Sequence, residues 1–321
     1  MNYDFGGRLT AEFPSQVIVD ATEVCNLACV HCPHPAFKKS EHYSGRQLDP
    51  DLNARLVDEV RERGQGFTQY IRYTGEGEPL IHPRGYQMVE YAARRSGVFV
   101  TLTTNGTIMN EKRTRQLLDS GVHLIDISLD ALSPEVYARI RVGGDLTVTR
   151  ANVLRLIEWV RSANAPTKVV VSFIEQPSNL HEAAEFERFW RDSGAADVVI
   201  RRLHSAAGAV IPIADVLRGQ PSNAGRYPCL YPWERITLNP RGELVFCPQD
   251  WVHGAVIADY RETTIYDMWR GPFYAGLRHA HQANAFDGHP FCGQCPDWQG
   301  TRWPGEGRSY ADMVADLRPP R

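Results

Sequence analysis

Three closely spaced cysteines follow the first apolar run of the sequence. The run QVIVD, residues 16–20, is followed by Cys25, Cys29 and Cys32, a Cys-x3-Cys-x2-Cys spacing. Three thiolates on one loop can bind three irons of a [4Fe–4S] cluster, whose usual ligand set is four cysteines. The remaining iron would keep an open coordination position, which metal-based catalysis requires. A zinc site, or three unrelated buried cysteines, is the alternative interpretation of this spacing.

The other four cysteines of the chain form a second group. They are Cys229, Cys247, Cys292 and Cys295, and no cysteine lies between the two groups. An odd total of seven argues against a disulfide framework. Four thiolates complete the ligand set of one iron–sulfur cluster and leave no open iron, so this site would carry electrons. Zinc bound by the same four thiolates is the structural alternative.

From Gln16 to about Leu203 the chain alternates short β-branched runs with amphipathic helical stretches. The candidate strands are QVIVDA, QYIRYTG, VFVTLTTN, LIDISLD, KVVVSFIEQ and DVVIRRL. The first long helix is predicted to start with Asp49 as N-cap and Pro50 at the first helical position. Gly97 and Gly121 stand where helices should end. This order predicts an α/β fold with a parallel sheet, open or curled into a partial (β/α)6 TIM barrel. The loops at the C-terminal ends of its strands, including the first cysteine loop, would face the active site.

After Leu203 the alternation of strands and helices stops. We expect a β-hairpin at the turn NPRGE, one helix over TIYDMWRGPFYAGLRHAHQ and a C-terminal helix near Ser309–Leu317. The predicted organisation is an N-terminal extension (1–15), the partial barrel (16–203), a linker (204–228), a small β-hairpin-plus-helix domain (229–300) and the C-terminal helix (301–321).

The bulk composition is that of an ordinary globular protein. Of 321 residues, 43% are hydrophobic and 23% charged, and the formal net charge is −3. No nucleic-acid partner is indicated by this charge balance. The sequence has no run of eighteen apolar residues and no apolar signal core, so we predict a cytoplasmic protein without a membrane partner.

These motifs together resemble the radical S-adenosylmethionine (SAM) superfamily. Its signature is CxxxCxxC after the first strand, often with a polar or aromatic residue before the third cysteine. The segment TGEGEPL resembles the family's Gly-Glu-Pro segment, whose backbone binds the SAM amino group, and glycine permits close backbone approach. TTNG and ISLDA match the ends of the third and fourth strands. The SAM-contacting positions implied by the resemblance are His31, Gly75, Glu76, Gly77, Glu78, Asn105, Ser128, Asp130, Arg141 and Ser172.

The segments PCLYPWE and GELVFC resemble the SPASM/twitch extension of the superfamily. The resemblance implies SAM and two [4Fe–4S] clusters as cofactors, one binding SAM and one auxiliary. A flavodoxin- or ferredoxin-type electron donor is implied as a partner. The reduced first cluster would cleave SAM to a 5′-deoxyadenosyl radical, which abstracts hydrogen from the substrate.

The single four-cysteine auxiliary site resembles that of aminocyclitol dehydrogenases of aminoglycoside-antibiotic pathways, of the butirosin and spectinomycin types. The predicted function is therefore oxidation of a secondary alcohol of a small-molecule aminocyclitol or amino sugar to a ketone, with the electron passed to the auxiliary cluster. Epimerisation of an amino sugar is an alternative, but relatives that epimerise use an additional cysteine thiol. A peptide-modifying enzyme is another, although about fifteen residues before the first strand leave little room for a peptide-recognition module. A non-catalytic metal-binding protein is the third alternative.

Few residues can be assigned to the substrate. In the butirosin-type dehydrogenase an arginine at the end of the sixth strand contacts the substrate hydroxyl, so Arg201 and Arg202 are the predicted catalytic residues. One of the two should point inward, because strand side chains alternate. Glu175 and Asp250 are candidates to bind a cationic substrate, and His204 is the only histidine at an expected strand end.

Overall fold

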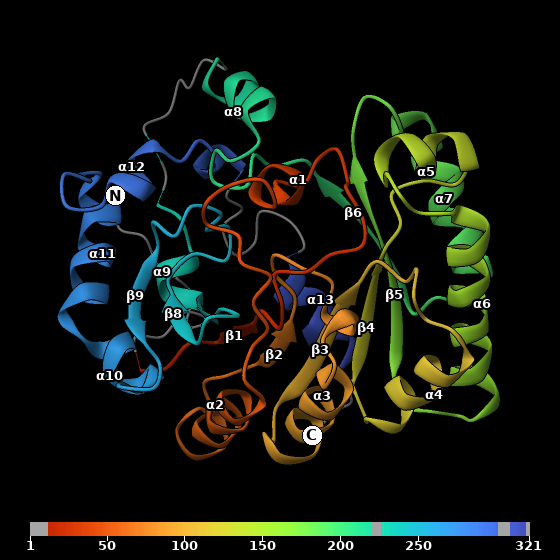
Figure 1. Cartoon of the computed structure of the whole chain (residues 1–321), viewed down its shortest axis with the longest axis horizontal. Coiled ribbons are helices and arrows are strands. Elements are labelled where there is room, and N and C mark those ends of the chain that lie inside the picture. Colours follow the sequence, from red (N-terminus) through yellow and green to blue (C-terminus); the bar gives the residue numbers. More distant parts are fainter. Residues whose placement is uncertain (1–11, 220–225, 227, 301–308, 319–321) are drawn as a thin grey trace.

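A single nine-stranded sheet organises the chain. The structure is a computed structural model, and it describes residues 12–219, 226, 228–300 and 309–318. The strand order is β6-β5-β4-β3-β2-β1-β7-β8-β9 (Figure 1). β1 to β7 pair in parallel, whereas β8 and β9 are antiparallel to their neighbours. The predicted α/β fold with a parallel sheet is confirmed.

The strands and helices have the following bounds. The strands are β1 Gln16–Val19, β2 Tyr70–Tyr73, β3 Phe99–Thr104, β4 Leu124–Ser128, β5 Lys168–Glu175, β6 Asp197–Arg202, β7 Arg235–Leu238, β8 Glu243–Val245 and β9 Val256–Asp259. The helices of the barrel part are α1 His34–Phe37, α2 Pro50–Arg63, α3 Gly85–Arg95, α4 Glu111–Asp119, α5 Pro134–Ile140, α6 Leu146–Ser162 and α7 Ala183–Asp192. The later helices are α8 Ile211–Arg218, α9 Tyr231–Glu234, α10 Ile265–Arg270, α11 Pro272–Ala283, α12 Pro290–Gln294 and α13 Tyr310–Leu317.

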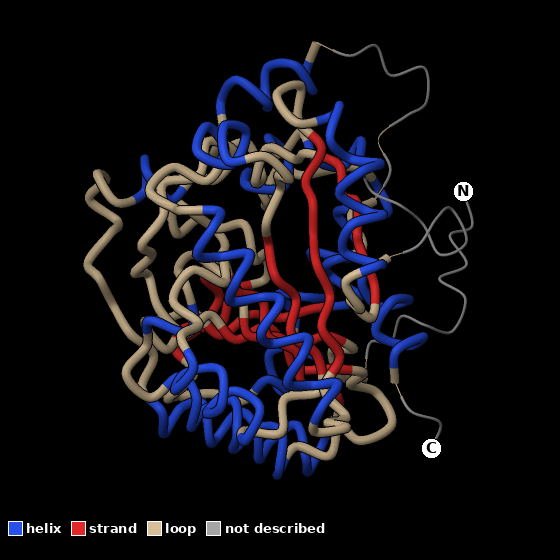
Figure 2. The backbone as a smooth tube through the Cα atoms, turned by 90° about the vertical axis from the view of Figure 1, so that its right-hand side faces the viewer, coloured by secondary structure: helices blue, strands red, loops and turns tan. Residues whose placement is uncertain are grey.

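The parallel strands bury both of their faces. Ile71, Val100, Ile125 and Val171 belong to the main core with the helices on the outside of the curved sheet (Figure 2). The residues that precede them, Tyr70, Phe99, Leu124 and Val170, point to the opposite face and pack against Met313 and Val314 of α13. Because α13 lies against this second face (dark blue beside β2 and β3 in Figure 1), it closes the interior of the barrel opposite the cysteine loop.

The strand β7 joins the two cysteine-bearing parts of the chain. It pairs with β1 in parallel over four residues, with Gln16 opposite Arg235 and Val19 opposite Leu238. The main-chain N–H of Asp20 then donates to the Leu238 carbonyl at 2.9 Å. The predicted hairpin is therefore β7–β8, with the addition that its first strand extends the barrel sheet.

Local sequence signals explain most element boundaries. Asp49 caps α2 by accepting from the Asp51 N–H, and Pro50 occupies the first position, as expected. The prediction of a single helix after the hairpin is wrong, because the segment divides into α10 and α11 at Gly271. Pro272 has no N–H to continue a helix and instead starts α11.

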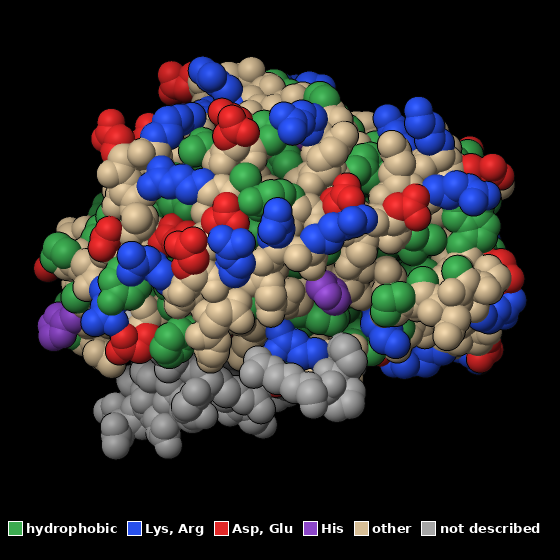
Figure 3. Space-filling model, turned by 90° about the horizontal axis from the view of Figure 1, so that it is seen from below, with side chains coloured by type: hydrophobic (Ala, Val, Ile, Leu, Met, Phe, Trp, Pro, Cys, Tyr) green, Lys and Arg blue, Asp and Glu red, His purple; other side chains and the backbone are tan. Residues whose placement is uncertain are grey.

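The described surface shows no concentration of one charge on the face drawn in Figure 3, where acidic and basic side chains are interspersed. Among the described residues, the helices are too short or too polar to cross a membrane.

Candidate metal centres and active site

The first cysteine loop leaves β1 and lies against the turn between α5 and α6. Main-chain hydrogen bonds join Ala28 N–H to Val142 O (2.8 Å) and Val30 N–H to Ile140 O (3.0 Å). All three cysteines of the loop are free thiols, and burial raises the pKa of Cys25 to about 11 and that of Cys32 to about 12. Metal binding as thiolates therefore has to displace protons at neutral pH.

Glu78, which follows β2, binds the end of β3 behind this loop. Its buried carboxylate accepts from the Thr104 hydroxyl (2.7 Å) and from the Asn105 N–H (2.8 Å). Asn105 in turn donates to the side chain of Asn26, which follows Cys25 (2.9 Å). The ends of β2 and β3 are thereby fixed relative to the first cysteine loop.

The glycines of the TGEGEPL segment are required by close backbone approach. A Cβ at Gly77 would lie 2.2 Å from the Thr22 carbonyl oxygen and 2.5 Å from that of Val24, and both are main-chain atoms. A Cβ at Gly75 would lie 2.0 Å from Cγ of Asp20. The segment thus packs directly against the chain leading to the first cysteine, and only glycine permits this approach.

Asp130 and Arg141 form a buried ion pair beside Cys29, and the His31 ring lies next to it. Asp130 is fully buried and has a positive φ of 62°; its Oδ2 lies 2.5 Å from Arg141 Nη2 and 3.6 Å from His31 Nε2. Arg141 Nη1 also donates to the Cys29 Sγ at 3.6 Å. Burial lowers the pKa of His31 to about 4, so the ring is neutral. A fixed guanidinium beside a cluster thiolate stabilises its negative charge.

A second buried ion-pair group occupies the barrel interior. Asp126 on β4 accepts from Arg201 (2.7 Å), Arg72 (3.3 Å) and the Ser172 hydroxyl. The Arg72 guanidinium also lies 3.7 Å from the centre of the Tyr310 ring on α13. Of the two predicted catalytic arginines, Arg201 points inward, whereas the Arg202 side chain is exposed.

The second group of cysteines comes together at one end of the β7–β9 part of the sheet. Burial raises the pKa of Cys247 well above its usual value, and the charges of Cys229, Cys295 and Cys292 act in the same direction. All four are therefore mutual electrostatic neighbours and free thiols. A ligand set of four neighbouring thiols, of which Cys292 is buried and the others are partly buried, fits an iron–sulfur cluster with no open iron.

No group of three or more His, Cys, Asp or Glu side chains within the described ranges is arranged around a single metal ion. The ligands of a cubane cluster need a wider arrangement, because each thiolate binds a different iron.

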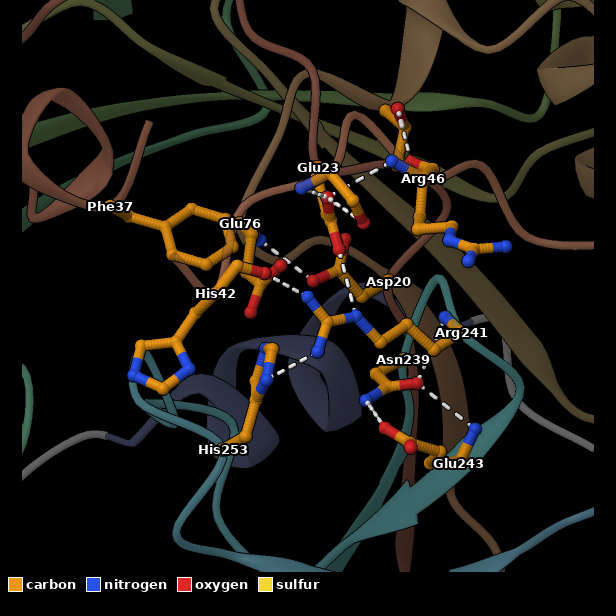
Figure 4. A network of polar contacts seen from close by, with 12 residues as sticks. Asp20, Glu23, Phe37, His42, Arg46, Glu76, Asn239, Arg241, Glu243 and His253 are labelled. Atoms are coloured by element: carbon orange, nitrogen blue, oxygen red, sulfur yellow. Dashed lines mark hydrogen bonds and ion pairs between the residues drawn. The ribbon is translucent and has the colours of Figure 1, made fainter. Parts of the chain in front are cut away.

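Arg241, in the β7–β8 turn, connects the two cysteine-bearing parts (Figure 4). Its Nε lies 3.1 Å from the Glu23 carboxylate, and its other nitrogens reach the His42 carbonyl and the His253 ring. Glu23 also accepts from the Ser44 and Arg46 N–H groups at 2.8 and 2.9 Å. The turn is thus anchored two residues before Cys25.

Two carboxyl groups face this junction. The Glu76 N–H donates to Asp20 Oδ2 at 2.8 Å. Burial is the main cause that raises the pKa of Asp20 to about 8 and that of Glu76 to about 10, and the neighbouring Glu23 raises both further. Both carboxyls are therefore mostly protonated at neutral pH, although the charge of Arg241 opposes the rise at Glu76.

Of the two carboxylates expected to bind a cationic substrate, Asp250 is near enough to Glu76 for its charge to raise the pKa of that carboxyl, whereas Glu175 lies elsewhere. Asp250 accepts from the N–H groups of Gly254 and Ala255, both at 2.8 Å, and so caps its own loop. Glu175 alternates with Ser172 and Ile174 along β5 and lies on the other face from the barrel interior. Asp20 and Glu76 form an acidic pair at the junction that was not predicted; the signal for Asp20 was an acidic residue directly after an apolar strand.

Two family models match this chain. The radical SAM superfamily model matches residues 19–186, and an iron–sulfur cluster-binding domain, SPASM, matches residues 229–296. The chain belongs to the radical SAM superfamily and is a radical SAM enzyme. Its cofactors are SAM, a [4Fe–4S] cluster and, in the SPASM domain, auxiliary iron–sulfur clusters.

Curated relatives are similar over part of their length. A probable GTP 3′,8-cyclase of Methanococcus maripaludis is 29% identical over 174 residues, 54% of each chain. The mycofactocin maturase MftC of Mycobacterium ulcerans is 29% identical over 235 residues, 73% of this chain and 57% of the relative. The chain thus spans little more than half the length of these relatives.

Solved structures share the fold. BtrN in complex with AdoMet and 2-DOIA matches with a TM-score of 0.58 at 17% identity, covering 88% of this chain and 92% of BtrN. Streptococcus suis SuiB bound to the precursor peptide SuiA matches with a TM-score of 0.67 at 14% identity, covering 95% of this chain and 73% of SuiB. At these identities the likeness concerns the fold alone.

Proposed function

We propose that the chain is a radical SAM dehydrogenase that oxidises a secondary alcohol of a cationic small molecule, an aminocyclitol or amino sugar, to a ketone. The observation that carries the proposal is the four-thiol auxiliary site on the sheet that also carries the first cysteine loop. The likeness to BtrN over nearly the full length of both chains supports the same reading.

When bound, the cofactors would supply a carbon radical that abstracts the carbinol hydrogen and a cluster that takes up the remaining electron. The chain's own groups would then bind the substrate and remove the hydroxyl proton. The Asp20 and Glu76 carboxyls suit an ammonium group, because a cation would favour their ionised forms. The Asp20 carboxyl, with its pKa of about 8, also titrates in the range that suits a proton acceptor.

Arg201 is the arginine that we assign to the substrate hydroxyl. It stays charged at all relevant pH values, so it would orient the oxygen and favour its deprotonation without serving as the base. Arg202, with its exposed side chain, is not included in the proposed site.

The test is anaerobic incubation of the reconstituted enzyme with SAM, a reductant and a panel of aminocyclitols. We expect a product that has lost two hydrogens, together with 5′-deoxyadenosine. A Cys292→Ala/Cys295→Ala variant should still cleave SAM reductively but form no ketone. Ketone formation by this variant at the parental rate would contradict the proposed electron acceptor.

Peptide modification is the second candidate, favoured by the likeness to MftC over 73% of this chain and to peptide-bound SuiB. This second function predicts that no aminocyclitol is consumed. It also predicts that a peptide encoded by a gene next to the gene for this protein is modified in the same assay.

A further inference from the structure

Arg226 is a cation held beside the auxiliary cysteines. Its Nη1 donates to the Gly293 carbonyl at 3.0 Å, and its Nη2 donates to the Cys292 carbonyl. The guanidinium lies 4.1 Å from the centre of the Phe286 ring. These three contacts fix the charge on the segment that carries two of the four ligands.

No carboxylate is recorded as an ion-pair partner of Arg226 within the described residues, and its Nε is buried without a hydrogen-bond partner. The titratable groups recognised as its electrostatic neighbours are Cys295, Cys292 and Cys229, which are charged only as thiolates. Placing a cation out of water without a counter-ion is costly, and a cation kept in this way usually has an anionic partner.

A [4Fe–4S] cluster held by four thiolates would be that partner, because it is an anion. We propose that the fixed charge of Arg226 serves as a counter-ion of the auxiliary cluster and raises its reduction potential. One-electron reduction makes the cluster more negative, so a nearby cation stabilises the reduced form more than the oxidised form. The net charge around a cluster is one of the factors that set its potential.

The inference rests on the proposed function in one respect. A raised potential would make the auxiliary cluster a better acceptor for the electron left on the substrate. The potential itself can be measured without substrate or SAM, so its outcome is independent of whether the chain oxidises an alcohol.

The experiment uses the full chain with Cys25, Cys29 and Cys32 replaced by alanine, so that only the auxiliary cluster is loaded. Iron content and an EPR-monitored redox titration are compared for this parent, R226Q, R226K and R278Q. Arg278 is the matched control: it is also half-buried, donates to the Pro232 carbonyl (2.9 Å) and stacks on Trp269 and Tyr274. No thiol charge is recorded as acting on it.

We expect R226Q to lower the equilibrium constant for reduction at least tenfold, a shift of about 59 mV for a one-electron couple. R226K and R278Q should stay close to the parent. Loss of the cluster from R226Q with full loading of R226K would also support the counter-ion. The proposal is overturned if loaded R226Q keeps the parental potential, or if R226K or R278Q shifts as far as R226Q. Failure of both Arg226 variants to load would overturn it as well, since charge would not be the deciding property.

Discussion

The guanidinium of Arg201 on β6 lies 2.7 Å from the fully buried carboxylate of Asp126 on β4. Asp126 also pairs with Arg72, so one carboxylate holds two arginines inside the barrel. Around Asp126 the barrel interior therefore carries an excess of positive charge. The ion pair with Asp126 also fixes the position of Arg201.

Asp126→Asn should destabilise the fold by about 3 kcal/mol, because both guanidiniums lose their counter-charge while remaining largely out of water. Urea-induced unfolding of the anaerobic protein measures the change. Glu187→Gln is the control: its partner Arg191 is 48% exposed, and breaking such a surface pair should cost below about 0.5 kcal/mol. Equal losses for the two variants would show that the buried pairing contributes nothing.

Gly77→Ala should disturb the first cysteine loop specifically. The added methyl group meets two main-chain carbonyls, which cannot move aside as a side chain could, and overpacking of this kind costs about 1–3 kcal/mol or more. We expect iron to fall from about eight to about four per chain, since the auxiliary cluster is unaffected. Gly288→Ala, with open space at its Cβ, should keep the full iron content. Full loading of Gly77→Ala would contradict the close approach.

Asp20 should make stability depend on pH. Its folded pKa of about 8 lies above the value of about 3.9 for an unfolded chain. Between these values the unfolded state has released a proton that the folded state retains, so stability should fall with rising pH, by about 1 kcal/mol per pH unit.

Urea unfolding at pH 6, 7 and 8 gives the total slope, to which the raised pKa of Glu76 contributes in the same direction. Asp20→Asn should reduce this slope by about 1 kcal/mol per pH unit. Asp259→Asn is the control, because the N–H of Arg261 lowers the pKa of that exposed carboxyl, which then stays ionised throughout this range. If the parent and Asp20→Asn show the same slope, the proton is not held at Asp20.

Met313→Ala should destabilise the protein by about 2–5 kcal/mol, because Met313 is 1% exposed and fills the inner face of the barrel. Thermal unfolding with iron content held equal is the measurement. Leu180→Ala, at a side chain 58% exposed, should change stability by no more than about 0.5 kcal/mol. A neutral Met313→Ala would mean that α13 does not contribute to the core.

Local signals in the sequence were sufficient for the strand order along the chain and for the N-cap at Asp49, because each depends on neighbouring residues only. The cysteine spacing likewise predicted the two metal sites that the family models match. The break between α10 and α11 could have been found as well, since Gly271-Pro272 is a common helix boundary.

The features that the sequence did not reveal depend on residues far apart in the chain. The pairing of β7 with β1 brings Gln16 opposite Arg235. The contact of Arg241 with Glu23 joins residues 218 positions apart in the sequence. Glu175 and Asp250 were chosen for their place after a strand or a cysteine. Alternation along β5 turns Glu175 away from the barrel interior, and Asp250 accepts from N–H groups of its own loop. Such contacts arise from tertiary packing, for which periodicity gives no signal.

The parallel pairing of β1 with β7 has a consequence for fragments of this protein. A chain ending before β7 would leave the main-chain donors and acceptors of β1 without their strand partner, next to the loop that carries the first three cysteines. Unpaired strand edges promote association between copies. Expressing the barrel alone should therefore give an aggregating product, and supplying the C-terminal piece as a separate polypeptide should restore a dispersed complex.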